Sequence, residues 1–257
     1  MYPISEKYND LLNTLSSVGE PIYPSEITQE IFTEMSLIRY YGWVYRKNMN
    51  RMVKHTTAEL FQDLIAHKLK RAFVGCENVK LVLEKNGNKI KINSKNKTPR
   101  VDIAIKKEGS FVALIEVKTN IGWSRPKNEE NWVEMQNRFK NLNESFDVDL
   151  DNIFLVLESP MNVSTPFANY WWDKKNNKKW DDPNLPDYWI YQQVIPLYYS
   201  ADPYYWDEFK EFRKEKNETE YPNLEDVMKV INDKKKTAQI MNLDKIINKV
   251  KGETNYG

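Results

Sequence analysis

The sequence predicts a layered α/β domain. Three observations carry this prediction: an apolar repeat of helical period over residues 56–73, short apolar runs of strand length after it, and a second helical repeat over 129–142 that leads into an apolar run at 153–157. Helices and strands that follow one another in this order bury their apolar faces by packing the helices against a sheet. The chain has 257 residues, 40% of them hydrophobic, which is enough for a sizeable core.

The composition argues against several classes of protein. No apolar run is long enough to span a membrane and no secretory signal is visible, so we expect a cytoplasmic protein with no membrane partner. The single cysteine, Cys76, can form no internal disulfide, and with two histidines in the chain it provides no ordinary zinc site. The net charge of +1 means that any basic surface for nucleic acid must be local.

Three helices are expected in the first part of the chain. A short one suits Glu6–Leu15, and apolar residues recur at helical spacing between residues 25 and 41. The strongest signal lies at 56–73, where Thr56 and Glu59 fit a capping box at the start of an apolar face.

Two strand pairs should follow. Val79–Glu84 and Lys89–Ile92 flank an Asn-Gly-Asn turn and are typical of a hairpin. The runs at 101–105 and 111–117 are joined by a polar connection that contains Gly109. Because the run at 111–117 is apolar on both faces, we expect this second pair inside the sheet rather than at its edge.

The chain changes character at residues 161–206, which are rich in tryptophan, tyrosine and proline. Such a segment hardly buries a core alone, so we interpret it as an elaboration on the sheet, with Val194–Tyr199 as one further strand. Its tryptophans suit core packing, and base stacking or a subunit interface are the alternatives. A dense basic loop suits either phosphate contacts or plain solvation; its lysines are Lys174, Lys175, Lys178 and Lys179.

We expect one domain over residues 1–257. Its core spans about 56–200, preceded by a helical segment at 1–55 and followed by a helical tail at 207–257. The tail has helical periodicity that continues from Leu224 to Val250, and three consecutive lysines at 234–236 are expected to interrupt it.

Three charged residues stand in the apolar strand pair: Asp102, Glu116 and Lys118. Strict alternation of strand side chains predicts one face formed by Val112, Leu114, Glu116 and Lys118 and the other by Phe111, Ala113, Ile115 and Val117. Asp102 and Glu116 can then converge as a pair of hard oxygen ligands suited to magnesium, and Lys118 reaches the same point to orient or deprotonate a water, or to stabilise phosphoryl charge. The alternative is a Glu–Lys pair at a strand end, with Asp102 merely starting its strand.

The pattern Pro99-Arg100-Val101-Asp102, followed by Glu116-Val117-Lys118, resembles the PD-(D/E)xK nuclease superfamily, whose fold type II restriction endonucleases share. The resemblance covers about residues 56–158 in element order. It departs from the family pattern in that two residues, Arg100 and Val101, separate the proline from the aspartate. The weight of the resemblance lies on the strands and helices around the three-residue motif.

The resemblance implies a restriction-endonuclease-like fold, with a central mixed β-sheet flanked by helices and an aromatic-rich carboxyl-terminal elaboration. It implies that Asp102 and Glu116 hold Mg²⁺, for which Mn²⁺ can substitute, with the backbone carbonyl of Val117 as a third ligand. Lys118 then has the role of activating the attacking water.

Two further residues match positions of the family on neighbouring helices. Glu59 matches an acidic position on the helix before the strands, although its part in a capping box explains it equally well. Gln136 resembles a glutamine often found on the helix after the strands, and its alternative is a solvated helix residue.

The expected activity is that of a Mg²⁺-dependent, sequence-specific endonuclease of the type II restriction class that cuts double-stranded DNA and leaves a 5′-phosphate and a 3′-hydroxyl. A homodimer is expected because two strands must be cut. The alternatives are a nuclease of the same fold in repair, phage defence or mobile-element processing, and a non-catalytic nucleic-acid-binding or interaction protein.

Overall fold

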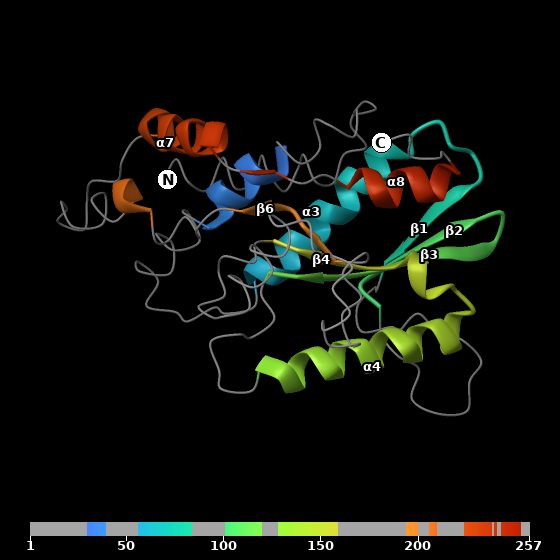
Figure 1. The fold of residues 1–257 in the computed structure, drawn as a ribbon. Coiled ribbons are helices and arrows are strands. Elements are labelled where there is room, and N and C mark those ends of the chain that lie inside the picture. The colour runs from blue at the N-terminus through green and yellow to red at the C-terminus, as the bar shows by residue number, and fades with distance from the viewer. Residues whose placement is uncertain are drawn as a thin grey trace.

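The computed structural model describes residues 30–39, 56–83, 101–119, 128–158, 194–199, 206–209, 224–237, 239–240 and 243–252 (Figure 1). Its centre is a five-stranded sheet in the order β1-β2-β3-β4-β5. The strands are β1 (Val79–Leu83), β2 (Ile103–Lys107), β3 (Ser110–Lys118), β4 (Ile153–Leu157) and β5 (Val194–Pro196). β1, β2 and β3 pair antiparallel, whereas β3–β4 and β4–β5 are parallel, so the sheet is mixed.

The hairpin of β2 and β3 lies inside the sheet, as predicted. A two-residue turn joins the strands, and both of its residues have positive φ, 53° at Glu108 and 87° at Gly109. This is the backbone of a type I′ turn, whose twist matches that of paired strands, and glycine adopts it without strain.

The predicted division of β3 into two faces is wrong at its beginning. Ile105 pairs with Ala113 but Lys106 pairs with Phe111, so Val112 is an extra residue in a β-bulge. Phe111 therefore packs edge-on against Phe146 of the helix below the sheet, with 5.2 Å between ring centroids. The alternation holds beyond the bulge, which leaves Leu114 and Glu116 on the same face as predicted.

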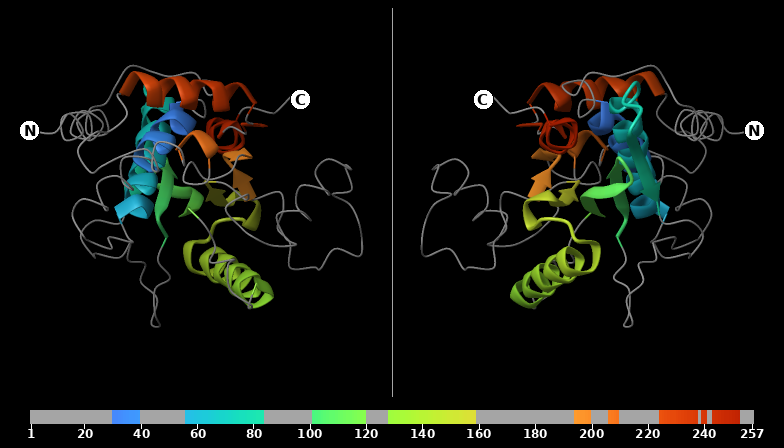
Figure 2. Two further views of the ribbon diagram at one scale, coloured as in Figure 1. Left: turned by 90° about the vertical axis from the view of Figure 1, so that its left-hand side faces the viewer. Right: turned by 90° about the vertical axis from the view of Figure 1, so that its right-hand side faces the viewer.

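Helices cover both faces of the sheet (Figures 1 and 2). α4 (Asn128–Phe146) lies along one face, while α3 (Thr56–Ala72), α8 (Asp244–Lys251) and the helix at residues 30–39 lie on the other. The helices of this second face share one buried cluster with Ala113, Ile115 and Val117 of β3. The α/β architecture, the helix at 56–73 and the helix at 129–142 are thus confirmed, the last being one turn longer than predicted.

Buried ion pairs fasten the helix at residues 30–39 to its neighbours. Lys68 of α3 has 1% of its side chain exposed and contacts Glu30 and, at 2.9 Å, Glu34. At the other end of this helix, Arg39 donates two hydrogen bonds to the carboxylate of Glu158, which follows β4 and has a fully buried side chain. Desolvation makes such pairs costly to separate, because each would leave a charge in the core.

The predicted helical tail contains more than helix. α7 (Leu224–Thr237) includes the three lysines at 234–236 as its last turn, so the prediction that they interrupt the helix is wrong. Lysines suit this position because the carboxyl end of a helix carries partial negative charge. Ile240 lies in β7 (Gln239–Ile240), which pairs with β6 (Tyr198–Tyr199) and not with any helix.

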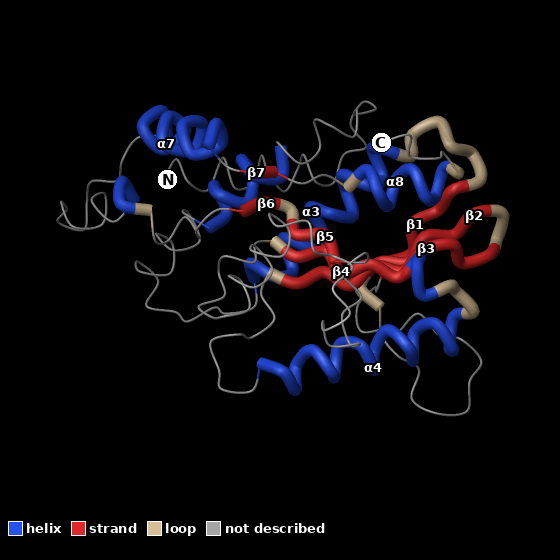
Figure 3. Tube along the Cα trace, in the orientation of Figure 1, coloured by secondary structure: helices blue, strands red, loops and turns tan. Residues whose placement is uncertain are grey.

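Figure 3 shows the strands of the second, two-stranded sheet beside the main one. The single strand predicted for Val194–Tyr199 is divided into β5 and β6. Pro196 closes β5 at the edge of the sheet, where its missing N–H costs no ladder hydrogen bond. Trp206 is buried against Phe32 and Phe209, which confirms the packing role expected of this tryptophan.

Several predictions lie outside the described residues. They are the helix at Glu6–Leu15, the strand at Lys89–Ile92 and the rest of the aromatic segment, including Lys174, Lys175, Lys178 and Lys179. Within the part of the chain that the structure describes, no helix is both long and apolar enough to cross a bilayer.

Candidate functional site

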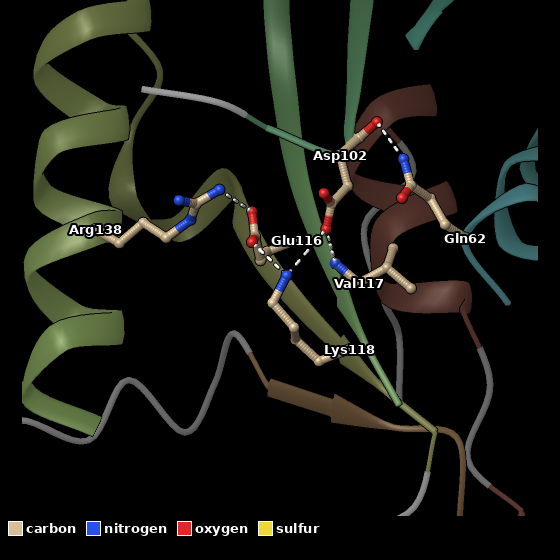
Figure 4. Close-up of polar contacts among 6 residues, drawn as sticks. All are labelled: Gln62, Asp102, Glu116, Val117, Lys118 and Arg138. Atoms are coloured by element: carbon tan, nitrogen blue, oxygen red, sulfur yellow. Dashed lines mark hydrogen bonds and ion pairs between the residues drawn. The ribbon is translucent and has the colours of Figure 1, made fainter. Parts of the chain in front are cut away.

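The site lies where β2 begins and β3 ends, on the face of the sheet covered by α4 (Figure 4). Asp102 stands immediately before β2, and its side chain is 17% exposed. Glu116 and Lys118 are two residues apart near the end of β3 and therefore share a face. Because β2 and β3 are antiparallel, the start of one strand and the end of the other meet at the same edge of the sheet.

Hydrogen bonds fix the position of Asp102. Its Oδ2 accepts the backbone N–H of Val117 at 2.8 Å, which takes the place of a ladder hydrogen bond beyond the end of β2. Its backbone carbonyl accepts a hydrogen bond from the Gln62 side chain of α3 at 3.3 Å. The aspartate is thus held by the sheet through β3 and by the helix α3.

Lys118 joins the two carboxylates. Its Nζ lies 2.6 Å from Glu116 Oε1 and 3.4 Å from Asp102 Oδ2. About a third of the Lys118 side chain is exposed, whereas only 2% of that of Glu116 is. The predicted trio is therefore brought together, with the lysine partly exposed to solvent and the glutamate buried.

The second oxygen of Glu116 is held by Arg138, whose Nη2 donates to Oε2 at 2.9 Å from α4. Burial, and then the nearby negative charge of Asp102, raise the pKa of Glu116 above its ordinary value. Lys118 and Arg138 oppose this rise because each favours the ionised carboxylate. The four charges of the site balance, two negative and two positive.

Carboxylate oxygens are the ligands that Mg²⁺ prefers, and those of Asp102 and Glu116 already contact one shared cation, the Lys118 ammonium. In a strand the N–H and C=O of one residue point to the same side, so the carbonyl of Val117 faces Asp102 as its N–H does. These donors fit a hard divalent cation in their chemistry. Among the residues that the structure describes, no cluster of three or more Asp, Glu, His or Cys side chains offers a metal site.

Two predicted site residues have side chains outside the described part of the chain. Glu59 lies on α3 and Gln136 on α4, so the backbone of each is placed on a helix next to the site. Gln62, three residues after Glu59, shares its side of α3 and contacts Asp102. The metal role of Glu59 and the DNA-binding role of Gln136 stay predictions.

Two residues of the site, Arg138 and Gln62, were missed by sequence reasoning. A signal for Arg138 exists: it lies four residues before Leu142 and next to Phe139, at the border of the buried face of α4. A cation at such a position can reach the sheet, but which carboxylate it meets depends on how α4 lies across the sheet. Gln62 carries no comparable signal, because glutamine on a helix is common.

Fold and site together define a mixed-sheet α/β protein with an aspartate, a glutamate and a lysine gathered at the edge of its central hairpin. No protein-family model, no curated protein and no solved structure matches this chain.

Proposed function

We propose that this protein is a Mg²⁺-dependent endonuclease of the PD-(D/E)xK superfamily that hydrolyses double-stranded DNA, most closely resembling a type II restriction enzyme. One observation carries the proposal: Asp102, Glu116 and Lys118 come from adjacent central strands, and both carboxylates contact the same ammonium group, at 3.4 and 2.6 Å. A central mixed sheet with helices on both faces agrees with the fold that the resemblance implies.

In this proposal Asp102, Glu116 and the Val117 carbonyl hold Mg²⁺, or Mn²⁺ in its place. When bound, the ion supplies electrostatic stabilisation of the negative charge that develops on the phosphoryl oxygens. Asp102 is kept in place by the Val117 N–H, so its ligand oxygen needs no large rearrangement. The Glu116 side chain is only 2% exposed, so water has little access to its carboxylate.

Lys118 is the residue that meets the reacting groups. An ammonium has three donors, so its Nζ can hold the attacking water and a phosphoryl oxygen at once. Water attacks phosphorus in line with the leaving oxygen and gives up a proton to solvent, the bond from phosphorus to the 3′-oxygen breaks, and that oxygen takes a proton from solvent. The products are a 5′-phosphate and a 3′-hydroxyl, as the resemblance implies.

The test is cleavage of supercoiled plasmid by the wild-type protein and by Asp102→Asn and Lys118→Met, in Mg²⁺ and in EDTA. We expect each substitution to lower the rate by roughly a hundredfold or more, while folding and duplex binding are retained. Lys80→Met is the matched control, because Lys80 is an exposed lysine on β1 that pairs with Lys106, near the end of β2 opposite to Asp102. Lys118→Met cutting at the wild-type rate would refute the assignment.

One observation favours a second candidate, a non-catalytic nucleic-acid-binding or interaction protein. Both oxygens of Glu116 already have cationic partners, and the charges of the site cancel without a metal ion. Such a protein would bind DNA or a protein partner and leave plasmid, single-stranded DNA and RNA intact in both Mg²⁺ and Mn²⁺. A homodimer, a cytoplasmic location and a role in restriction rather than repair, phage defence or mobile-element processing stay predictions.

A further inference from the structure

Arg138 is a fourth charged member of the site that the nuclease motif does not include. It reaches Glu116 from α4, opposite the strand that carries Lys118 (Figure 4). Its Nη2 lies 2.9 Å from Glu116 Oε2, and Lys118 Nζ lies 2.6 Å from Oε1, so each oxygen of this carboxylate faces one cation. Removing either cation would leave a buried carboxylate with less than its present charge compensation.

A divalent cation at Asp102 and Glu116 would upset this balance. It would add two positive charges next to the Arg138 guanidinium, which already contacts the ligand residue Glu116. Like charges that share one carboxylate in a buried site repel strongly. Glu116 cannot move away, because only 2% of its side chain is exposed and it belongs to a central strand. The Arg138 and Lys118 side chains are each 33% exposed, but Lys118 also contacts Asp102, so within the Glu116–Arg138 pair it is Arg138 that has room to turn toward solvent.

We propose that Arg138 is a phosphate-binding residue, held on Glu116 in the metal-free protein and transferred to a phosphodiester of bound DNA when a divalent cation occupies the site. The inference rests on the proposed nuclease function. The planar guanidinium presents paired donors that match phosphate oxygens, which makes arginine suited to this task. A phosphate beside the site would also replace the negative charge that Arg138 loses on leaving Glu116.

The experiment compares wild type with Arg138→Met, Arg138→Lys and the control Lys140→Met, which changes an exposed residue two positions along α4. Calorimetry measures the binding of Ca²⁺ to each protein without DNA. Filter binding measures the affinity for a long linear plasmid duplex, once in Ca²⁺ and once in EDTA, and a gel checks that the duplex stays intact. Circular dichroism confirms that each variant is folded.

Arg138→Met should bind Ca²⁺ roughly tenfold more tightly than wild type, because a competing positive charge is gone. Compared with wild type, it should bind DNA roughly tenfold more weakly in Ca²⁺ and equally well in EDTA. The affinity in EDTA is unchanged because in metal-free wild type Arg138 is paired with Glu116 and does not contact DNA. Arg138→Lys should bind Ca²⁺ like wild type because it keeps the charge, and should lose part of the DNA affinity in Ca²⁺ because it lacks the paired donors, whereas Lys140→Met should match wild type. Weaker or unchanged Ca²⁺ binding by Arg138→Met, or an equal loss of DNA affinity with and without Ca²⁺, would overturn the inference.

The outcomes separate this inference from the proposed function. Wild-type protein that binds no Ca²⁺ and cuts no DNA in Mg²⁺ rejects the proposed function, and the inference with it. Wild-type protein that cuts DNA, together with an Arg138→Met variant that behaves like wild type in both binding assays, rejects the inference alone. If Arg138→Met does not fold, Arg138→Gln takes its place, because it keeps donors for Glu116 without the charge.

Discussion

Replacing Arg39 by methionine should destabilise the domain through a carboxylate far away in the sequence. Arg39 is on the helix at residues 30–39, and its guanidinium donates from Nε to Glu158 Oε1 at 3.0 Å and from Nη2 to Oε2. Glu158 follows β4 and donates its backbone N–H to the Lys118 carbonyl at 3.0 Å. The pair therefore ties an outer helix to the edge of the sheet where the candidate site lies.

The size of the effect follows from burial. The Glu158 side chain is 0% exposed and that of Arg39 only 20%, so the substitution removes a cation from a carboxylate that water does not reach. Breaking a buried pair on one side costs about 3–5 kcal/mol. We expect the lower end, about 3 kcal/mol, because the arginine itself is partly exposed, and a fall in Tm of roughly 6–12 °C.

Urea denaturation followed by circular dichroism measures the loss. The double variant Arg39→Met/Glu158→Gln removes the buried charge as well and should be more stable than Arg39→Met alone. Lys236→Met is the control, because Lys236 and its partner Asp233 are 74% and 59% exposed and such a surface pair contributes little to stability. A loss below about 1 kcal/mol for Arg39→Met, or a double variant that is less stable than the single, would refute the reasoning.

Two further stability predictions follow from polar contacts of the sheet. Burial and then the charge of Asp102 raise the pKa of Glu116 in the folded protein above its ordinary value. The free energy of unfolding is therefore highest below the ordinary pKa and falls as pH rises through the raised pKa, where folded Glu116 loses its proton. In EDTA, Glu116→Gln should therefore unfold at higher urea concentration than wild type at neutral pH, with the gain fading below the ordinary carboxyl range; a less stable variant at neutral pH would contradict this. Lys107 donates to the Val250 and Lys251 carbonyls at the end of α8, at 3.1 and 3.4 Å. Lys107→Met should cost about 0.5–1 kcal/mol and speed hydrogen exchange in α8, whereas unchanged exchange there would count against this cap.

The sequence predicts the elements of the core well because their signals are local. The apolar stripe of α3 and the continuous apolar run of β3 each define one element, and both lie in the interior as expected. The β-bulge at Val112 could not be foreseen, because it depends on the pairing of β3 with β2 and breaks the alternation of one strand. The strand at Ile240 could not be foreseen for the same reason, because this two-residue strand depends on pairing with Tyr198 and Tyr199.

In the site as well, contacts that follow from local patterns could be predicted, and contacts between distant segments could not. Asp102, Glu116 and Lys118 could be predicted as neighbours because strand alternation and a short hairpin bring them together. Arg138 could not be assigned, because its contact depends on how α4 lies across the sheet. The pair of Arg39 and Glu158 joins residues 119 positions apart, and no local pattern indicates such a contact.

The central claim is that Asp102, Glu116 and Lys118 form a metal-dependent nuclease centre, and digestion of one long duplex of known sequence tests it most directly. In Mg²⁺ the wild-type protein should produce discrete fragments with 5′-phosphate ends, and neither wild type in EDTA nor Asp102→Asn in Mg²⁺ should produce any. Folded wild-type protein in molar excess that leaves the duplex intact in both Mg²⁺ and Mn²⁺ would contradict the claim.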